Sequence, residues 1–169
     1  MRGTWYRTSL ALVLCVTMSA SAQSQLRKVG RPVPRFVLSA AVSTNPGLGS
    51  GSFFEGQPKL LNLFASWCVP CAAESKSLMK IARLGVPIDA VAVRDTSGGL
   101  ARFLGRYGNP YRRIGADLDG RVQAKFGSAE VPQTFVIDGR GVIRFQHVGD
   151  IQDEDIPDLL VALRAARFY

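Results

Sequence analysis

The chain has 169 residues, of which 47% are hydrophobic and 20% are charged, and its formal net charge is +8 at pH 7. This composition is that of an ordinary globular protein, and the length suits one domain rather than two. The basic residues are scattered without a dense run, so the charge indicates a solvated surface, and we expect no nucleic-acid partner.

The first 22 residues have the three parts of a secretory signal peptide. Two arginines give a positive start, residues 10–18 form an apolar run, and Ala20-Ser21-Ala22 offers a small-residue cleavage pattern. The apolar run is shorter than the about 20 residues that span a bilayer, although an uncleaved membrane anchor is the alternative. We therefore expect residues 1–22 to be removed after export and residues 23–29 to form a flexible arm.

The first half of the remaining domain, residues 30–169, alternates extended and helical patterns. Prolines restrict residues 30–38 to a short edge strand, and the glycine-rich residues 39–58 are typical of a loop. The apolar runs 59–65 and 88–93 indicate strands that are buried on both faces. A helical stretch over 72–84 separates them, which predicts a parallel pair joined by a right-handed crossover.

The second half predicts one more helix, a hairpin and a C-terminal helix. Apolar residues recur at i, i+3, i+4 and i+7 within residues 97–107, which favours a helix. The apolar stretches 134–137 and 141–145 flank Asp138-Gly139-Arg140, as in a hairpin. A last helix opens near Asp155, with acidic residues at its start and arginines at its end. The expected fold is one α/β domain with a central mixed sheet flanked by helices.

Removal of the signal peptide, with Cys15, leaves two of the three cysteines, Cys68 and Cys71. A disulfide between them closes a very small loop, so it would stabilise the fold little. The pair follows the strand at 59–65, and Pro70 between the cysteines fits the first turn of a helix. The helix start favours the Cys68 thiolate, and Cys71 lies one turn further on. The pattern therefore predicts a nucleophilic Cys68 and a resolving Cys71.

Two other interpretations of the pair are possible. Half of a zinc site would need two more ligands, and beyond the pair the mature chain offers only His147 among cysteines and histidines. A purely structural pair in the core is the second alternative. The position of the pair between strand and helix, directly after Trp67, favours redox chemistry over both, and we expect no metal ion.

The stretch from Asn62 to Cys71 resembles the active-site strand and helix start of the thioredoxin superfamily. More narrowly, the chain resembles the periplasmic thiol–disulfide interchange proteins of cytochrome c maturation, called DsbE or CcmG, and it shares features with TlpA and ResA relatives. The narrower resemblance covers roughly residues 30–169 and rests on these segments: Arg94-Asp95, Gly108-Asn109-Pro110-Tyr111, residues 126–138 with Val131-Pro132-Gln133-Thr134, and residues 144–150.

The resemblance implies a role for each matching residue. It implies that Pro132 is the cis-proline beside the cysteines, since cis bonds are nearly always found before proline. Glu74 matches the acidic residue that this family carries three positions after the second cysteine, which implies that it accepts a proton from Cys71 and tunes both thiols. The alternative is a first-turn helix glutamate favoured by the helix dipole. Asn62 stands where thioredoxin has a buried aspartate, so the acid–base duty would move to Glu74. Trp67 completes the candidate catalytic set of Cys68, Cys71, Pro132, Glu74 and Trp67. We expect His147 to serve packing or hydrogen bonding.

The resemblance also implies a thiol–disulfide oxidoreductase with no cofactor other than the redox-active Cys68–Cys71 disulfide. Its expected substrate is apocytochrome c or other exported protein thiols, and its expected electron donor is a membrane thiol reductase. We expect a monomer in the periplasm, soluble after signal cleavage or anchored to the inner membrane. The alternatives are a general or DsbA-type disulfide exchange protein of the same compartment, and a redox-inert binding module.

Overall fold

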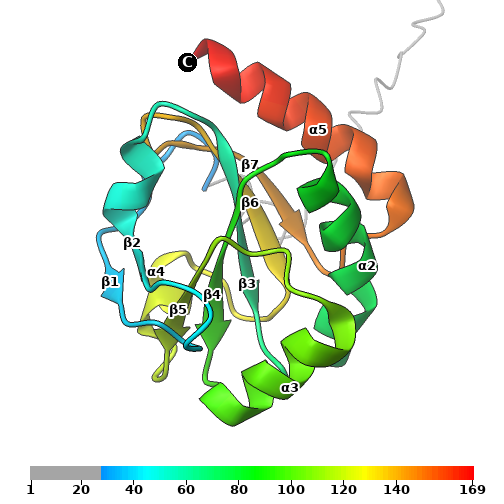
Figure 1. The fold of residues 1–169 in the computed structure, drawn as a ribbon. Helices are drawn as coiled ribbons and strands as arrows, with labels where there is room; N and C mark the ends of the chain where they lie inside the picture. The colour runs from blue at the N-terminus through cyan, green and yellow to red at the C-terminus, as the bar shows by residue number, and fades with distance from the viewer. Residues whose placement is uncertain (1–27) are drawn as a thin grey trace, which may run out of the picture.

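A computed structural model describes residues 28–169, so the predicted signal peptide and most of the predicted arm lie outside the described residues. Five strands form one mixed sheet in the order β5-β4-β3-β6-β7 (Figure 1). β3, β4 and β5 run parallel to one another. β6 pairs antiparallel with β3, and β7 pairs antiparallel with β6. The strands are β3 (Lys59–Phe64), β4 (Ile88–Val93), β5 (Arg113–Asp117), β6 (Gln133–Ile137) and β7 (Ile143–Val148).

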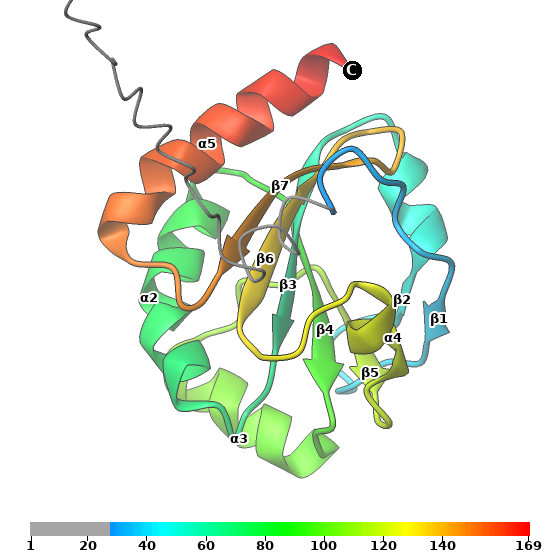
Figure 2. The ribbon, with the colours of Figure 1, turned by 180° about the vertical axis from the view of Figure 1, so that it is seen from behind.

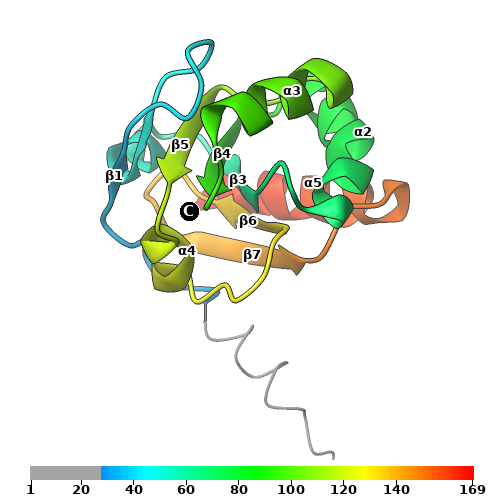
Figure 3. The same ribbon diagram turned by 90° about the horizontal axis from the view of Figure 1, so that it is seen from below.

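Helices cover both faces of the sheet. One face carries the three long helices, and the other carries a short helix and a 3-10 helix, as Figure 3 shows from below and Figure 2 from behind. The first group is α2 (Val69–Arg83), α3 (Ser97–Tyr107) and α5 (Ile156–Ala165); the second is α4 (Arg121–Lys125) and the 3-10 helix Ser50–Phe54. Within residues 28–169, no helix is long and apolar enough to cross a membrane.

The structure confirms the predicted mixed sheet between helices and most of its elements. The buried strands at 59–65 and 88–93 are β3 and β4, which pair in parallel with each other and are connected by α2. The helix predicted over 97–107 is α3, and the hairpin around Asp138-Gly139-Arg140 is formed by β6 and β7. These segments are long and strongly patterned, so their local sequence matches their structure.

Other predictions of local structure held in part or missed an element. The segment 30–38 contains a short strand as predicted, β1 (Val37–Leu38), which pairs outside the main sheet with β2 (Leu48–Gly49). The prediction that residues 39–58 are loop was wrong where β2 and the 3-10 helix Ser50–Phe54 form. β5 and α4 were not predicted. β5 has a glycine and charged ends, and its backbone becomes a strand by pairing with β4. Its Gly115 is required, because a Cβ there would lie 2.7 Å from the Leu38 Cβ.

The alternation of side chains along β3 places the core on both faces and one polar residue inside it. Leu60 and Phe64 pack toward α2, α3 and α5, whereas Leu61 and Leu63 pack toward α4. Successive side chains of a strand point to opposite faces. Asn62 therefore lies on the same face as Leu60 and Phe64, beneath α2, and it is fully buried.

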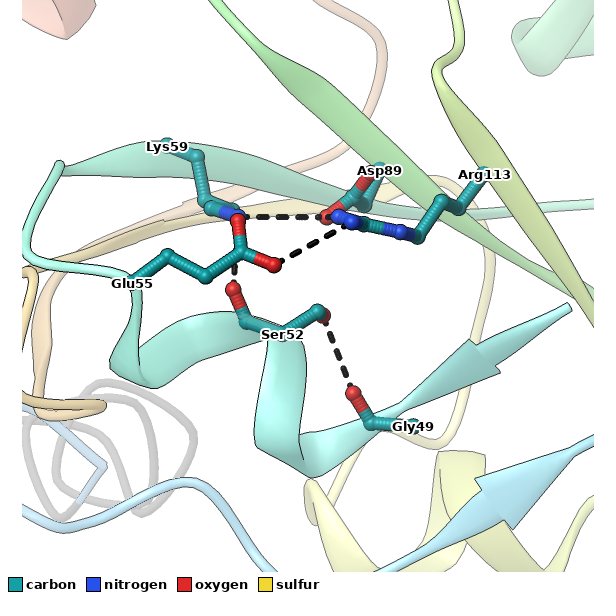
Figure 4. Close-up of polar contacts among 6 residues, drawn as sticks. All are labelled: Gly49, Ser52, Glu55, Lys59, Asp89 and Arg113. Carbon is teal, nitrogen blue, oxygen red and sulfur yellow. Dashed lines mark hydrogen bonds and ion pairs between the residues drawn. The ribbon is translucent and has the colours of Figure 1, made fainter. Parts of the chain in front are cut away.

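A cluster of charged residues lies on the other face, at the start of β3 (Figure 4). The buried Lys59 ammonium donates to the Ser52 carbonyl at 2.6 Å and to Glu55 Oε2 at 2.9 Å. Its Nζ is also 3.7 Å from Asp89 Oδ2, and the Arg113 guanidinium lies 3.6 Å from the same oxygen. Lys59 and Arg113 therefore provide positive charge beside the Asp89 carboxyl group, which is buried.

Candidate active site

The two cysteines lie just after β3, at the start of α2. Cys68 is the N-cap residue of α2, and Pro70 lies in the first turn, where its missing N–H is not needed. The cysteines form a disulfide with a Cα–Cα distance of 5.2 Å. The Cys71 N–H donates to Cys68 Sγ at 3.1 Å. In the reduced protein this donor and the positive helix end would favour a Cys68 thiolate.

The turn that carries the cysteines is fixed from the neighbouring strand. Asp95 follows β4 and accepts hydrogen bonds from the backbone N–H and, at 2.8 Å, the hydroxyl of Ser66. The indole N–H of Trp67 donates to the Arg94 carbonyl at 3.1 Å. These contacts anchor the two residues before Cys68, so the Cys68 sulfur is held at a defined position beyond the C-terminal end of β3.

The surface around Cys68 is apolar and open, although the sulfurs themselves are recessed. Cys68 and Cys71 are 5% and 2% exposed, whereas Trp67 and Val69 are 59% and 81% exposed. The Val131–Pro132 peptide bond is cis, and the Val131 carbonyl oxygen lies 3.5 Å from Cys68 Sγ. An extended peptide lying on this surface would bring its own disulfide against Cys68.

Glu74 lies one helical turn after Cys71 and is fully buried. Asn62 Nδ2 donates to Glu74 Oε1 at 3.0 Å, and the Ile151 N–H donates to Glu74 Oε2 at 3.2 Å. The same Asn62 nitrogen donates to Thr134 Oγ1 at 3.0 Å, and Asn62 Oδ1 accepts from the Tyr111 hydroxyl at 2.8 Å. Two segments that are distant in sequence therefore meet at the Glu74 carboxyl group, and two more meet at the Asn62 amide that donates to it.

Burial governs the protonation of this carboxyl group. Removal from water raises the pKa of Glu74 to about 8, against the opposing effect of the Asn62 and Ile151 hydrogen bonds. The charge of Asp150 raises the same pKa further. Burial, followed by the charge of Glu74, holds the pKa of the Tyr111 hydroxyl well above its ordinary value. Glu74 can therefore gain or lose a proton near neutral pH, while Tyr111 remains a hydrogen-bond donor.

The structure brings Cys68, Cys71, Trp67 and Pro132 to one edge, with Glu74 behind the cysteines on α2. His147 lies further along β7, where its Nε2 is 3.4 Å from the Asp150 carbonyl oxygen.

Sequence reasoning assigned no role to Thr134, Ile151 or Tyr111 in this site. The signal for Tyr111 was its place in the segment 108–111, which resembles the interchange proteins. Ile151 acts through its backbone N–H, so its side chain carries no signal. Within residues 28–169, no three or more Cys, His, Asp or Glu side chains form a group that could hold a metal ion.

A disulfide that opens a helix at the end of a central strand, in a sheet of this order, defines the thioredoxin-like fold. The chain is a thiol–disulfide oxidoreductase of that class. A model of the redoxin family matches residues 28–163. The chain is 38% identical over 136 residues to the thiol:disulfide interchange protein DsbE of Vibrio cholerae, covering 80% of this chain and 73% of that protein.

Two further relatives agree with this match. DsbE of Yersinia pestis is 36% identical over 125 residues, which are 74% of this chain and 66% of that protein. The crystal structure of a DsbE candidate from Chlorobium tepidum has a TM-score of 0.65 and 26% identity, over 82% of this chain and 97% of that one. The chain belongs to the redoxin family and, within it, to the DsbE thiol:disulfide interchange proteins.

Proposed function

We propose that the protein is an exported reductant that keeps the cysteines of apocytochrome c as free thiols for haem attachment. The observation that carries this proposal is where the segments that resemble the cytochrome c maturation proteins lie. Residues 108–111 supply Tyr111, residues 126–138 supply the Val131 carbonyl beside Cys68, and residues 144–150 lead directly to the Ile151 N–H on Glu74. The resemblance is thus concentrated around the cysteine pair.

The proposed reaction is a reduction in two exchange steps. The Cys68 thiolate attacks a substrate disulfide, so that a mixed disulfide forms and the first substrate sulfur leaves as a thiolate that takes up a proton. Cys71 then gives its proton to the Glu74 carboxylate and attacks Cys68 Sγ. This attack breaks the mixed disulfide, and the second substrate thiolate takes a proton from Glu74. Two electrons pass to the substrate, and the Cys68–Cys71 disulfide is the oxidised product.

The residues between the cysteines support the reducing direction. A strong oxidant of the DsbA type is one whose reduced form is stabilised, and a cation between the cysteines would stabilise a thiolate. Val69 and Pro70 supply no such charge. The proposed electron donor is a thiol reductase of the membrane, and the proposed location is the periplasm, after removal of residues 1–22.

Deletion of the gene tests the proposed function. We expect covalently bound haem, measured by in-gel haem staining, to fall, because the two thiols of the haem-attachment segment close on each other in an oxidising compartment. An added small thiol should restore the haem, and a Cys68→Ser copy of the gene should not. Normal haem attachment together with a general loss of exported disulfides would instead favour the DsbA-type oxidant.

The roles of the two cysteines can be separated by trapping. Cys71→Ala should attack substrates but fail to release them, so mixed disulfides should accumulate on non-reducing gels. Cys68→Ala should trap far less, because Cys71 is recessed behind Cys68 at the helix start. Equal trapping by the two variants, or more by Cys68→Ala, would show that the nucleophile is misassigned.

A further inference from the structure

Tyr111 is held so firmly that its hydroxyl has a fixed position. Its ring packs against Phe64 with the centroids 4.8 Å apart. Its backbone N–H donates to Asn109 Oδ1 at 3.1 Å, and its carbonyl accepts from Asn45 Nδ2 at 2.8 Å. Asn109 Nδ2 in turn donates to Asn45 Oδ1 at 2.8 Å. The segment 108–111 therefore fixes Tyr111 from both sides, and the hydroxyl reaches Asn62.

The contact between Tyr111 and Asn62 decides which way the buried amide faces. A side-chain amide has an oxygen end that accepts and a nitrogen end that donates. The Tyr111 O–H donates to Asn62 Oδ1, which leaves both N–H groups of the amide for Glu74 and Thr134. If the amide turned over, the hydroxyl hydrogen of Tyr111 would lose its acceptor in a buried site, which is costly.

We propose that Tyr111 is a positioning residue of the redox site, whose hydroxyl locks the Asn62 amide with its N–H toward Glu74. The inference rests on the proposed role of Glu74 as the proton acceptor for Cys71. A fixed donor on Glu74 Oε1 stabilises the carboxylate, whereas an amide oxygen in the same place would stabilise the protonated acid. Tyr111 thereby holds Glu74 ready to accept a proton, without touching the cysteines itself.

Few other groups can influence this carboxyl group. Among residues 28–169, the charged or titratable groups on this side of the sheet around Glu74 are Asp150 after β7, His147 on β7 opposite Thr134, Tyr111 before β5, and the cysteines on its own helix. β3 and β6 present the neutral side chains of Asn62 and Thr134 to it. The cysteines do not titrate in the oxidised protein, and Asp150 and His147 are the same in every variant, so a difference in the titration of Glu74 between variants reports on the amide.

The test is the titration of Glu74 in the oxidised full chain, followed by NMR of ¹³C-labelled glutamate carboxyl groups. Glu74→Gln assigns the signal. Tyr111→Phe removes only the hydroxyl and keeps the ring on Phe64. We expect the midpoint for Glu74 to rise by about one pH unit, the size that loss of a hydrogen bond to a charged group produces. Tyr107→Phe is the matched control on the exposed end of α3, and it should leave the midpoint unchanged.

A second pair of variants tests whether the effect passes through the amide. In an Asn62→Leu background, Tyr111→Phe should produce no further shift, because the amide that it orients is gone. An unchanged midpoint in Tyr111→Phe overturns the inference, and so does an equal shift in the Asn62→Leu background. The proposed role of Glu74 fails separately, if Glu74→Gln leaves the pH dependence of thiol alkylation in the reduced protein unchanged.

Discussion

Glu74 and Asp89 are both fully buried carboxyl groups, and they lie on opposite faces of the same sheet. Glu74 receives hydrogen bonds from neutral groups, the Asn62 amide and the Ile151 N–H. Among residues 28–169, the Asp89 carboxyl group accepts no hydrogen bond, and two cations lie 3.6 and 3.7 Å from its Oδ2. Burial raises the pKa of both groups, but only Asp89 has the charges of Lys59 and Arg113 to oppose this rise.

This difference suits Glu74 to exchanging protons and Asp89 to holding Lys59 and Arg113 in place. When Glu74 takes up a proton, no buried cation in the described part of the chain loses its counter-charge. When Asp89 takes up a proton, Lys59 loses a partner inside the protein, which is unfavourable. Neutral donors therefore suit the carboxyl group behind the redox pair, and cations suit the one at the far end of the sheet. Variants of each group can test this contrast.

The largest effect is expected from Lys59→Met. This variant leaves Asp89 with Arg113 alone and removes a partner of Glu55, and breaking a buried ion pair in this way costs about 3–5 kcal/mol. The loss in the free energy of unfolding, measured with urea at pH 7, should shrink toward pH 4, where Asp89 can be protonated in the folded state. Lys80→Met removes an exposed pair with Asp153 and should cost much less. Equal losses in the two variants would remove the special status of the buried cluster.

Glu74→Gln is expected to have a smaller effect, a change in the slope with which the free energy of unfolding depends on pH. Folding raises the pKa of Glu74 from 4.5 to about 8, so between these values the folded protein binds one proton more than the unfolded chain. The stability that this proton contributes is complete below pH 4.5 and is lost as the pH rises to about 8, by at most about 1.4 kcal/mol per pH unit.

Urea unfolding of the oxidised protein at several pH values would measure this slope. Glu74→Gln should flatten it, apart from a remainder at the acidic end that Asp89 contributes with the same sign. Glu154→Gln changes an exposed glutamate and should keep the slope of the parent protein. If Glu74→Gln keeps that slope too, Glu74 does not carry the buried proton.

The smallest effect is expected from Glu55→Gln. Glu55 pairs with Lys59 and Arg113, but its side chain is 48% exposed, and solvent screens such pairs. We expect the free energy of unfolding at pH 7 to change by about 0.5–1 kcal/mol or less. The hydrogen bond from Lys59 lowers the pKa of Glu55, so any loss should be present above pH 4.5 and vanish in acid. A loss as large as that of Lys59→Met would mean that Glu55, and not Asp89, anchors the lysine.

The cysteine pair and most of the elements around it could be predicted from local sequence. The cysteine pair, the apolar run of β3 before it and the periodicity of α3 are local signals, because strand and helix periods are written in neighbouring residues. β5 and α4 escaped prediction, since β5 is a strand only through its pairing with β4 and α4 has five residues. Its short length gives α4 too few turns to show a period.

The surroundings of the two buried acids could not be predicted from the sequence, because they depend on how distant segments pack. Asn62 and Thr134 are 72 positions apart and become neighbours because β6 pairs antiparallel with β3. Tyr111 reaches the same amide because α3 carries the chain back across the sheet into β5. The residues next to Glu74 and Asp89 in sequence do not indicate that Glu74 is surrounded by neutral donors and Asp89 by two cations. Hydrogen bonds and desolvation depend on which groups lie within a few ångströms in space, and the register of distant strands sets those distances.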